Sequence, residues 1–308
     1  MTDTLNFLPP DPILERREKI QRRAAKTLRR RTIASRAFLV MLVGAFVLAL
    51  VPLGSVIFAL IEKGVSSITW NFLRTLPHQP SLIAQNDIGG IGNAIEGTLV
   101  LDGLAGLVAI PIALLIGLYL AETLSRSADF LRRVIEIMTG LPSILLGVFA
   151  YEYVVVPMKT FSGLAGIVAL SVLMVPFIAK ASELAFRGVP SSLREAGLAL
   201  GARPSRVARG IIFPAALPGV ITGVLLSLAR AMGETAPILL VIGASGTWGW
   251  NPLHQMSSLP LLTYNYSGSQ YPSERAAAWG VALTLVVMVM VLSVGSRLVA
   301  ARMRRERP

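Results

Sequence analysis

The sequence predicts an all-α integral membrane protein with six membrane-spanning helices and both termini in the cytosol. Three observations support this prediction. The 308 residues are 54% hydrophobic, only 15% are charged, and the mean hydropathy is +0.65, whereas roughly 25% of residues are charged in soluble domains. Several apolar runs exceed the ~20 residues needed to cross a bilayer. Basic residues are concentrated in alternate segments between these runs.

The apolar runs set the domain organisation, which we take in chain order. A basic N-terminal arm (1–36) precedes the first span (37–61) and an outer loop (62–93). A core of five further spans (94–299) contains a polar loop at 190–214, and a basic tail (300–308) follows. We place the five core spans at 94–121, 134–156, 163–184, 215–242 and 277–299. Pro142 predicts a kink in the third span.

The distribution of Lys and Arg predicts the orientation. With the N-terminus inside, the four inner segments hold ten, three, six and five basic residues, and the outer segments hold four. Positive charge accumulates on the cytosolic side of membrane proteins, so both termini are expected there. The same rule accounts for the net charge of +12 without a nucleic-acid partner.

Two regions outside the spans each allow two interpretations. The arm contains LERREKIQRRAAKTLRRR, which is either a solvated tail that fixes topology or a basic helix lying on anionic membrane lipid. The last outer loop holds two Trp and three Tyr residues: Trp248, Trp250, Tyr264, Tyr266 and Tyr271. They form either an interfacial aromatic belt or a docking rim for an external partner.

The loop 190–214 is polar and helix-forming. Ser192 and Glu195 have the spacing of a capping box at a helix start, and Gly201 can end that helix in the left-handed conformation. Pro204 suits the first position of a second short helix. The expected product is a helical hairpin at the cytosolic surface. Leu198 and Leu200 would be exposed on it, and exposed apolar residues of this kind indicate a partner.

The fifth span carries a charge pair in an apolar setting. Arg230 and Glu234 are four residues apart and so share a helix face. An intramembrane charge faces a cavity or a partner, and a guanidinium binds tetrahedral oxyanions in a bidentate manner. The pair is either a self-neutralising structural element or an anion-binding arginine held by a carboxylate. Pro214, Pro218 and Pro237 predict kinks in this span.

The loop resembles the EAA loop of ABC-importer permeases. The series Glu195-Ala196-Gly197-x3-Gly201-x9-Ile211-x-Phe213-Pro214 matches the spacing EAA-x3-G-x9-I-x-L-P throughout. It departs from the pattern at Gly197 and Phe213. The resemblance implies that Glu195, Ala196, Gly197, Gly201 and Pro214 couple the chain to an ATPase subunit.

The run ARAMGETAP (229–237) resembles the signature of PstA-type permeases of phosphate ABC transporters. Sulfate and molybdate permeases, the alternative, tend to read RAxGEFGAT at this point. Further similar segments are GGIGNAIEGTL (89–99), IPIALLIGLYLAE (110–122) and LPSILLGVFAY (141–151). The resemblance assigns substrate translocation to Arg230, Glu234 and Thr235.

The resemblance also implies the setting. The fold would be that of a type I, MetI-like importer permease in the bacterial cytoplasmic (inner) membrane. The partners would be a second homologous permease forming a heterodimer, two ATP-binding subunits and an extracytoplasmic phosphate-binding protein, with phosphate as the transported ion. This chain would bind no cofactor, because it has no phosphate loop; ATP and Mg²⁺ would be used by the partner subunit.

A membrane-embedded enzyme is the remaining alternative. GASG (243–246) resembles the nucleophile motif of rhomboid intramembrane proteases. A serine nucleophile needs a base within hydrogen-bond reach, and the following span has no histidine. The chain has no cysteine and only two histidines, His78 and His254, which argues against a metal centre.

Overall fold

The structure, a computed structural model, describes residues 12–78 and 88–305. Its described part is helical, without a strand beyond one isolated bridge between Pro77 and Gly89. The outermost parts of the basic arm and tail (1–11 and 306–308) and the middle of the first outer loop (79–87) lie outside the described residues. The chain divides into two compact units, residues 1–59 and 60–308.

The first unit consists of most of α1 (Pro12–Val65), a helix of 54 residues. The stretch from Ala34 to Val65 is apolar enough to cross a membrane. A helix that is hydrophobic over this length is suited to the interior of a bilayer. The predicted first span is therefore present as a helix, and the basic residues that precede it continue the same helix.

The second unit is the permease core. Its elements after the end of α1 are α2 (Trp70–Arg74), α3 (Gly92–Glu122), α4 (Arg126–Gly140), α5 (Ser143–Ala150), η1 (Tyr151–Val155), α6 (Val156–Met158), α7 (Gly163–Arg187), α8 (Ser191–Ala199), α9 (Pro204–Val207), η2 (Ala208–Ile212), α10 (Phe213–Ala231), α11 (Ala236–Leu239), α12 (Leu259–Ser267) and α13 (Pro272–Arg305).

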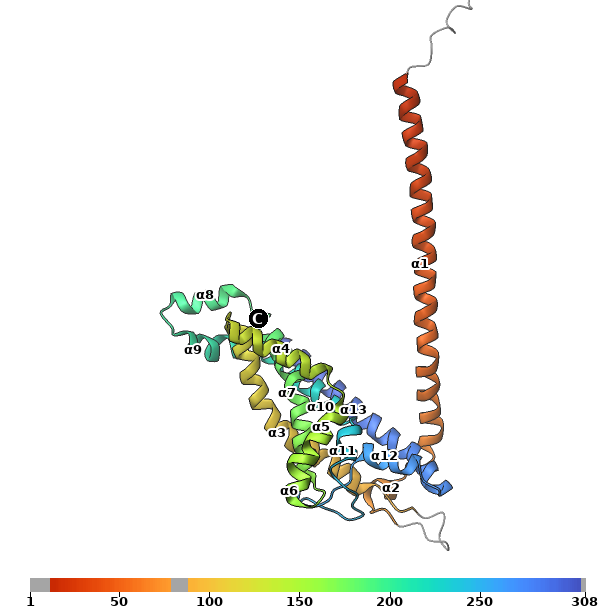
Figure 1. The fold of residues 1–308 in the computed structure, drawn as a ribbon, viewed down its shortest axis with the longest axis vertical. Helices are drawn as coiled ribbons and strands as arrows, with labels where there is room; N and C mark the ends of the chain where they lie inside the picture. Colours follow the sequence, from red (N-terminus) through yellow and green to blue (C-terminus); the bar gives the residue numbers. More distant parts are fainter. Residues whose placement is uncertain (1–11, 79–87, 306–308) are drawn as a thin grey trace, which may run out of the picture. The chain divides into compact units, whose positions relative to one another are not determined.

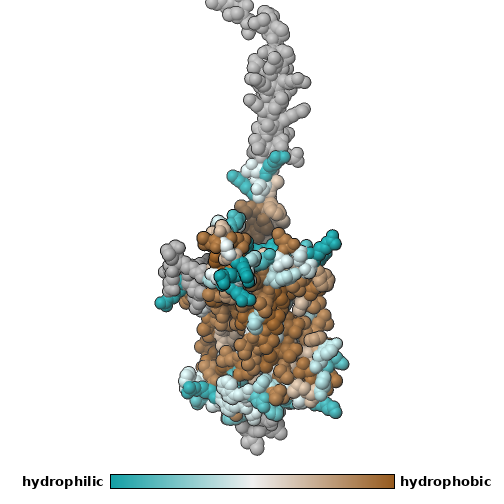
Figure 2. All heavy atoms as spheres, turned by 90° about the vertical axis from the view of Figure 1, so that its left-hand side faces the viewer, coloured by the Kyte–Doolittle hydropathy of each residue, from teal (hydrophilic) through white to brown (hydrophobic). Residues whose placement is uncertain are grey.

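Two groups of short elements mark the ends of this unit. Figure 1 shows α8 and α9 at one end, beside the start of α4, and α2, α6 and α12 at the other. Between the two ends, the face seen in Figure 2 carries a band of hydrophobic side chains bordered by hydrophilic rims. This pattern is that of a helix bundle inserted in a bilayer.

The centre of the unit is the packing of α3 on α7, and α10 also packs on α7. Small residues allow this close approach, as they do in other membrane helix bundles. A Cβ atom on Gly117 would lie 2.9 Å from the carbonyl oxygen of Ala179. One on Gly223 would lie 2.5 Å from the Cβ of Ala181. Larger residues at these glycines would separate the helices.

The predicted spans are present, with one correction. Five described helices are long and apolar enough to cross a membrane, and a bent helix pair brings the number to six. That pair is the predicted third span, which is broken rather than kinked: α4 and the segment 143–158 meet at 98°. Pro142 disfavours the helical conformation of the residue before it, and Leu141 accordingly has an extended backbone.

Candidate functional site

The fifth span breaks at the predicted charge pair. The helix α10 ends at Ala231, and α11 begins at Ala236. Two turn hydrogen bonds close the gap, from Gly233 N to Arg230 O (3.1 Å) and from Glu234 N to Ala231 O (3.0 Å). Gly233 is a poor helix former, and Pro237 supplies no N–H to continue the α10 ladder. Pro218, where we expected a kink, lies within α10.

Arg230 lies at this break with its charge only loosely neutralised. Its guanidinium lies 4.2 Å from the centroid of the Phe177 ring on α7. Its Nε atom is 3.7 Å from Oε1 of Glu234, and the two side chains are 55% and 18% exposed. At 3.7 Å this is an ion pair without a hydrogen bond. Among the described residues, the guanidinium donates no hydrogen bond, so its N–H groups are available to a ligand.

The surroundings of Arg230 form a shallow hollow between three helices. A cavity of about 460 Å³ is lined by α7, α10 and α13, with Phe177, Ser227 and Arg230 in its wall. Thr235 is half-buried directly before α11, and its hydroxyl makes no hydrogen bond within the described residues. The structure thus brings Arg230 and Glu234 together, as predicted, and places Thr235 beside them in sequence without a contact.

The loop 190–214 forms the expected hairpin, with a different start. The helix α8 begins at Ser191 with Pro190 as its N-cap and no side-chain cap hydrogen bond. The predicted capping box of Ser192 and Glu195 is therefore wrong: Ser192 already lies inside the helix, where its hydroxyl cannot act as the cap. Gly201 has the left-handed conformation predicted for it, with φ of +80°.

The second arm of the hairpin continues into the membrane. Pro204 begins α9 as predicted, and 204–231 form one helical stretch of 28 residues through η2 and α10. Pro214 lies at the start of α10, directly after the π-helical turn η2. The expected separate second helix is therefore the cytosolic end of the fifth span.

Gly197, which departs from the EAA pattern, lies at the contact between the two arms. A Cβ atom here would lie 2.8 Å from Cδ1 of Ile211 and 3.0 Å from Cγ2 of Val207. Glu195 and Ala196, which precede it on α8, are exposed. Leu198 is also exposed, and Leu200 is 88% exposed. The hairpin therefore presents an apolar surface that the described part of the chain does not cover, which is typical of a docking site.

An ionic network that the sequence did not predict ties the cytosolic helix ends together. Glu183 on α7 forms ion pairs with Arg132 on α4 (3.1 Å) and with Arg187 (3.0 Å). Both arginines also donate to the carbonyl oxygen of Leu120, near the end of α3. The spacing of Glu183 and Arg187, four apart in sequence, was the available signal.

A second missed contact holds α8 against α3. Arg194 Nη2 donates to Glu122 Oε1 at 2.6 Å, and both side chains are partly buried. These residues are 72 positions apart, and no helical or strand spacing relates residues so far apart.

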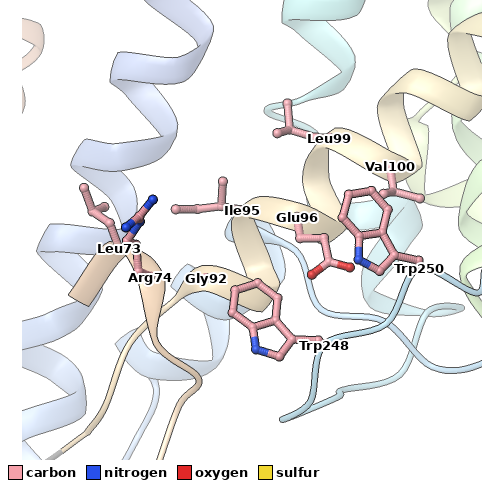
Figure 3. Close-up of a pocket in the computed structure, with 9 residues that line it drawn as sticks. All are labelled: Leu73, Arg74, Gly92, Ile95, Glu96, Leu99, Val100, Trp248 and Trp250. Atoms are coloured by element: carbon pink, nitrogen blue, oxygen red, sulfur yellow. The ribbon is translucent and has the colours of Figure 1, made fainter. Parts of the chain in front are cut away.

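The aromatic residues of the last outer loop do not form one continuous rim. Trp248, Trp250 and Tyr264 are exposed, whereas Tyr266 is buried in a cluster with Phe72 and Leu259. Figure 3 shows the two tryptophans beside Glu96 of α3.

The described residues do not contain the serine–histidine contact that a membrane protease would need. The hydroxyl of Ser245 lies 3.2 Å from that of Thr247, and no hydrogen bond joins it to a histidine in the described chain. The comparisons with known proteins point away from an enzyme too, because the proteins found are transport permeases.

Residues 109–305 match the family model described as "Binding-protein-dependent transport system inner membrane component". The chain is 35% identical to a probable phosphate transport system permease protein PstA of Methanocaldococcus jannaschii, over 87% of this chain and 94% of that protein. It is 35% identical to the PstA of Haemophilus influenzae, over 79% and 85%. It is 34% identical to PstA 1 of Mycobacterium tuberculosis, over 91% and 92%.

Two solved structures share the fold. An inward-facing MetNI methionine ABC transporter matches with a TM-score of 0.58 at 24% identity, over 69% of this chain and 95% of that one. A bacterial alginate ABC transporter matches with a TM-score of 0.59 at 16% identity, over 87% and 93%. The MetI-like importer fold expected from the sequence is confirmed. The chain belongs to the family of binding-protein-dependent transport system inner membrane components, as a multi-pass permease of the PstA type.

Proposed function

We propose that this chain is a permease subunit of an ATP-driven importer of inorganic phosphate. The observation that carries the proposal is the Arg230 guanidinium, which donates no hydrogen bond among the described residues and is more than half exposed at a break in a membrane helix. The relatives that align with most of this chain are phosphate transport system permeases. A planar guanidinium suits the tetrahedral oxygens of phosphate.

The loose ion pair of Arg230 with Glu234 supports a role in passing an ion through the membrane rather than in retaining it. An ion in a conduction pathway must bind well enough to enter and weakly enough to leave. Glu234 lies at 3.7 Å from the guanidinium, so phosphate can take up its N–H groups without first breaking a hydrogen bond. The carboxylate can also accept a hydrogen bond from the hydroxyl that phosphate retains at neutral pH. Thr235 adds a hydroxyl that is not bonded in the described structure.

Coupling to ATP hydrolysis would run through the hairpin. We assign the contact with an ATP-binding subunit, and the transmission of that subunit's movement, to Glu195, Ala196, Gly197, Gly201 and Pro214. Movement of α8 and α9 would pass along the continuous helix 204–231, which is about 42 Å long at 1.5 Å per residue. Arg230 lies at the far end of that helix. Its reorientation would expose phosphate alternately to the two sides of the membrane.

The proposed assembly contains this chain and a second, homologous permease. Two ATP-binding subunits, which use ATP and Mg²⁺, would dock on the cytosolic hairpins of the two permeases. An extracytoplasmic phosphate-binding protein would deliver the ion. The chain itself would hold no cofactor, because its sequence contains no phosphate-binding loop of the G-x4-G-K-[ST] type.

Copurification from native membranes, followed by uptake of labelled phosphate, tests the proposal. Wild type should copurify with an ATP-binding subunit and take up phosphate, with little competition from sulfate or molybdate. Arg230→Gln should keep the subunit and lose uptake by at least about ten-fold, since a hydrogen bond to a charged group contributes roughly 1.5–3 kcal/mol. Arg230→Lys should retain part of the activity. Absence of the ATP-binding subunit, or normal uptake by Arg230→Gln, would refute the assignment.

A further inference from the structure

A cavity on the outer side of the core is lined by the carboxylate of Glu96, which forms no ion pair among the described residues. It measures about 820 Å³ and is lined by the end of α2, the first turns of α3 and the loop after α11. In Figure 3 the carboxylate of Glu96 points toward the space beside Trp248 and Trp250, while Arg74 lies beyond Ile95. The pathway assigned to Arg230 does not use this cavity, whose lining shares no residue with the hollow around Arg230.

Glu96 is buried and has no polar partner. Its residue is 8% exposed, and neither carboxylate oxygen has a hydrogen-bond partner within the described structure. An ionised carboxylate that is removed from water without a partner is strongly destabilising. The Glu96 carboxylate is therefore suited to pair with a cation that another molecule supplies.

A second acceptor lies one helical turn earlier. Asn93 is 4% exposed, and its Oδ1 atom also has no hydrogen-bond partner among the described residues. Its Nδ2 atom donates to the carbonyl oxygen of Ser245 at 2.7 Å. This bond ties α3 to the loop that carries Trp248 and Trp250. Residues three apart share a helix face. This turn of α3 thus holds three buried oxygen acceptors without a donor in the described structure, and the two of Glu96 belong to a residue that lines the cavity.

The indoles complete a wall that favours a cation. Trp248 packs so closely on Gly92 that a Cβ atom there would lie 2.5 Å from the ring, which fixes the indole. Trp250 is 76% exposed and can cover a ligand. Arginine and lysine are attracted to aromatic faces, and a guanidinium has five donors to match several acceptors. Arg74, the cation already in the wall, stacks on Trp70 at 4.4 Å.

We propose that this cavity receives an arginine side chain of the extracytoplasmic binding protein when that protein docks. The occupant follows from charge complementarity, from the excess of acceptors and from the position of the cavity on the side where a binding protein arrives. The inference rests on the proposed function, because it needs a binding protein as partner. It assigns Glu96, Asn93 and the two tryptophans to docking rather than to the transport pathway.

The test uses the complete transporter in lipid nanodiscs with purified phosphate-binding protein. The binding-protein concentration for half-maximal ATPase stimulation is measured for wild type and for Glu96→Gln. We expect this concentration to rise at least about thirty-fold in Glu96→Gln, since loss of one partner of a buried charge pair at an interface typically has this effect. Basal ATP hydrolysis and subunit composition should not change. Glu152→Gln, which alters an exposed carboxylate outside the cavity, is the matched control.

Equal stimulation of wild type and Glu96→Gln would overturn the inference. Loss of the second permease from the Glu96→Gln complex would also overturn it, because the cavity would then hold a residue of that subunit. An identical defect in Arg74→Gln would identify Arg74, and not an arginine of the binding protein, as the cation that pairs with Glu96. Restoration of docking in Glu96→Arg by an Arg→Glu variant of the binding protein would support the inference directly. If the binding protein fails to stimulate even wild type, the proposed function fails rather than this inference.

Discussion

The cytosolic hairpin and the break at Arg230 occupy the two ends of one helix, yet different interactions hold them. The hairpin depends on backbone geometry and close packing, through the positive φ of Gly201 and the contact of Gly197 with Val207 and Ile211. The break depends on side-chain chemistry, through Arg230 with Phe177 and Glu234.

This difference matches what each region would have to do. A docking element must keep its shape when it is pushed, and backbone constraints keep a shape independently of ion concentration. A substrate contact must change partners, and a loose ion pair changes partners easily. Substitutions that alter backbone geometry should therefore act mainly at the hairpin. Substitutions that alter charge should act mainly at the break.

The largest effect is expected from Gly201→Pro. Proline fixes φ near −65°, whereas Gly201 has φ of +80° and donates its N–H to the carbonyl oxygen of Leu198 at 2.9 Å. The substitution should reverse the turn and abolish substrate-stimulated ATP hydrolysis, with the protein still inserted in the membrane. Reconstituted transporter measures the stimulation. Gly201→Asn, which tolerates the left-handed conformation, should retain it. Unchanged stimulation in Gly201→Pro would contradict a mechanical role for the hairpin.

A smaller and more selective effect is expected from Glu234→Gln. The amide NH₂ group can turn toward phosphate, and the carboxylate that would accept its hydroxyl hydrogen is lost. Phosphate uptake should fall about ten-fold, in line with one hydrogen bond to a charged group, and sulfate should compete more strongly. ATP-binding subunit content and basal hydrolysis should stay at the wild-type level. Normal phosphate uptake that still excludes sulfate would show that selection takes place elsewhere, for example in the binding protein.

The sequence predicts best what depends on local patterns. The apolar runs locate the spans, the positions of Gly201 and Pro204 locate the turn of the hairpin, and the spacing of Arg230 and Glu234 brings these two residues together. Each of these features depends on residues within one turn or on a run of one composition. The capping box failed for a related reason: α8 begins two residues earlier than the pattern implied, and the boundary of a helix is set by small differences.

What escaped prediction depends on helices that meet only in the folded chain. The pairing of Arg194 with Glu122, and of Arg132 with Glu183, joins residues 72 and 51 positions apart. The cation–π contact of Arg230 with Phe177 requires the packing of α10 on α7. The reason for glycine at position 197 is also tertiary, because it lies in the approach of α8 to Val207 and Ile211.

The smallest effect is expected from Gly197→Ala, which restores the family's usual residue. Alanine favours the helix by up to about 1 kcal/mol over glycine. Its Cβ atom would lie 2.8 Å from Cδ1 of Ile211, but that atom ends a flexible side chain and can move aside. The two effects oppose each other, so ATPase stimulation should stay within about two-fold of wild type.

Gly197→Leu sharpens the same test. Its side chain cannot fit between α8 and Val207, whose branched carbon already lies 3.0 Å from the expected Cβ position. The leucine should push α8 away from the second arm of the hairpin and reduce stimulation far more than alanine does. Equal effects of the two substitutions would mean that the packing of the two arms does not matter for coupling. The geometry of the turn at Gly201 would then be sufficient to present α8 to the ATP-binding subunit.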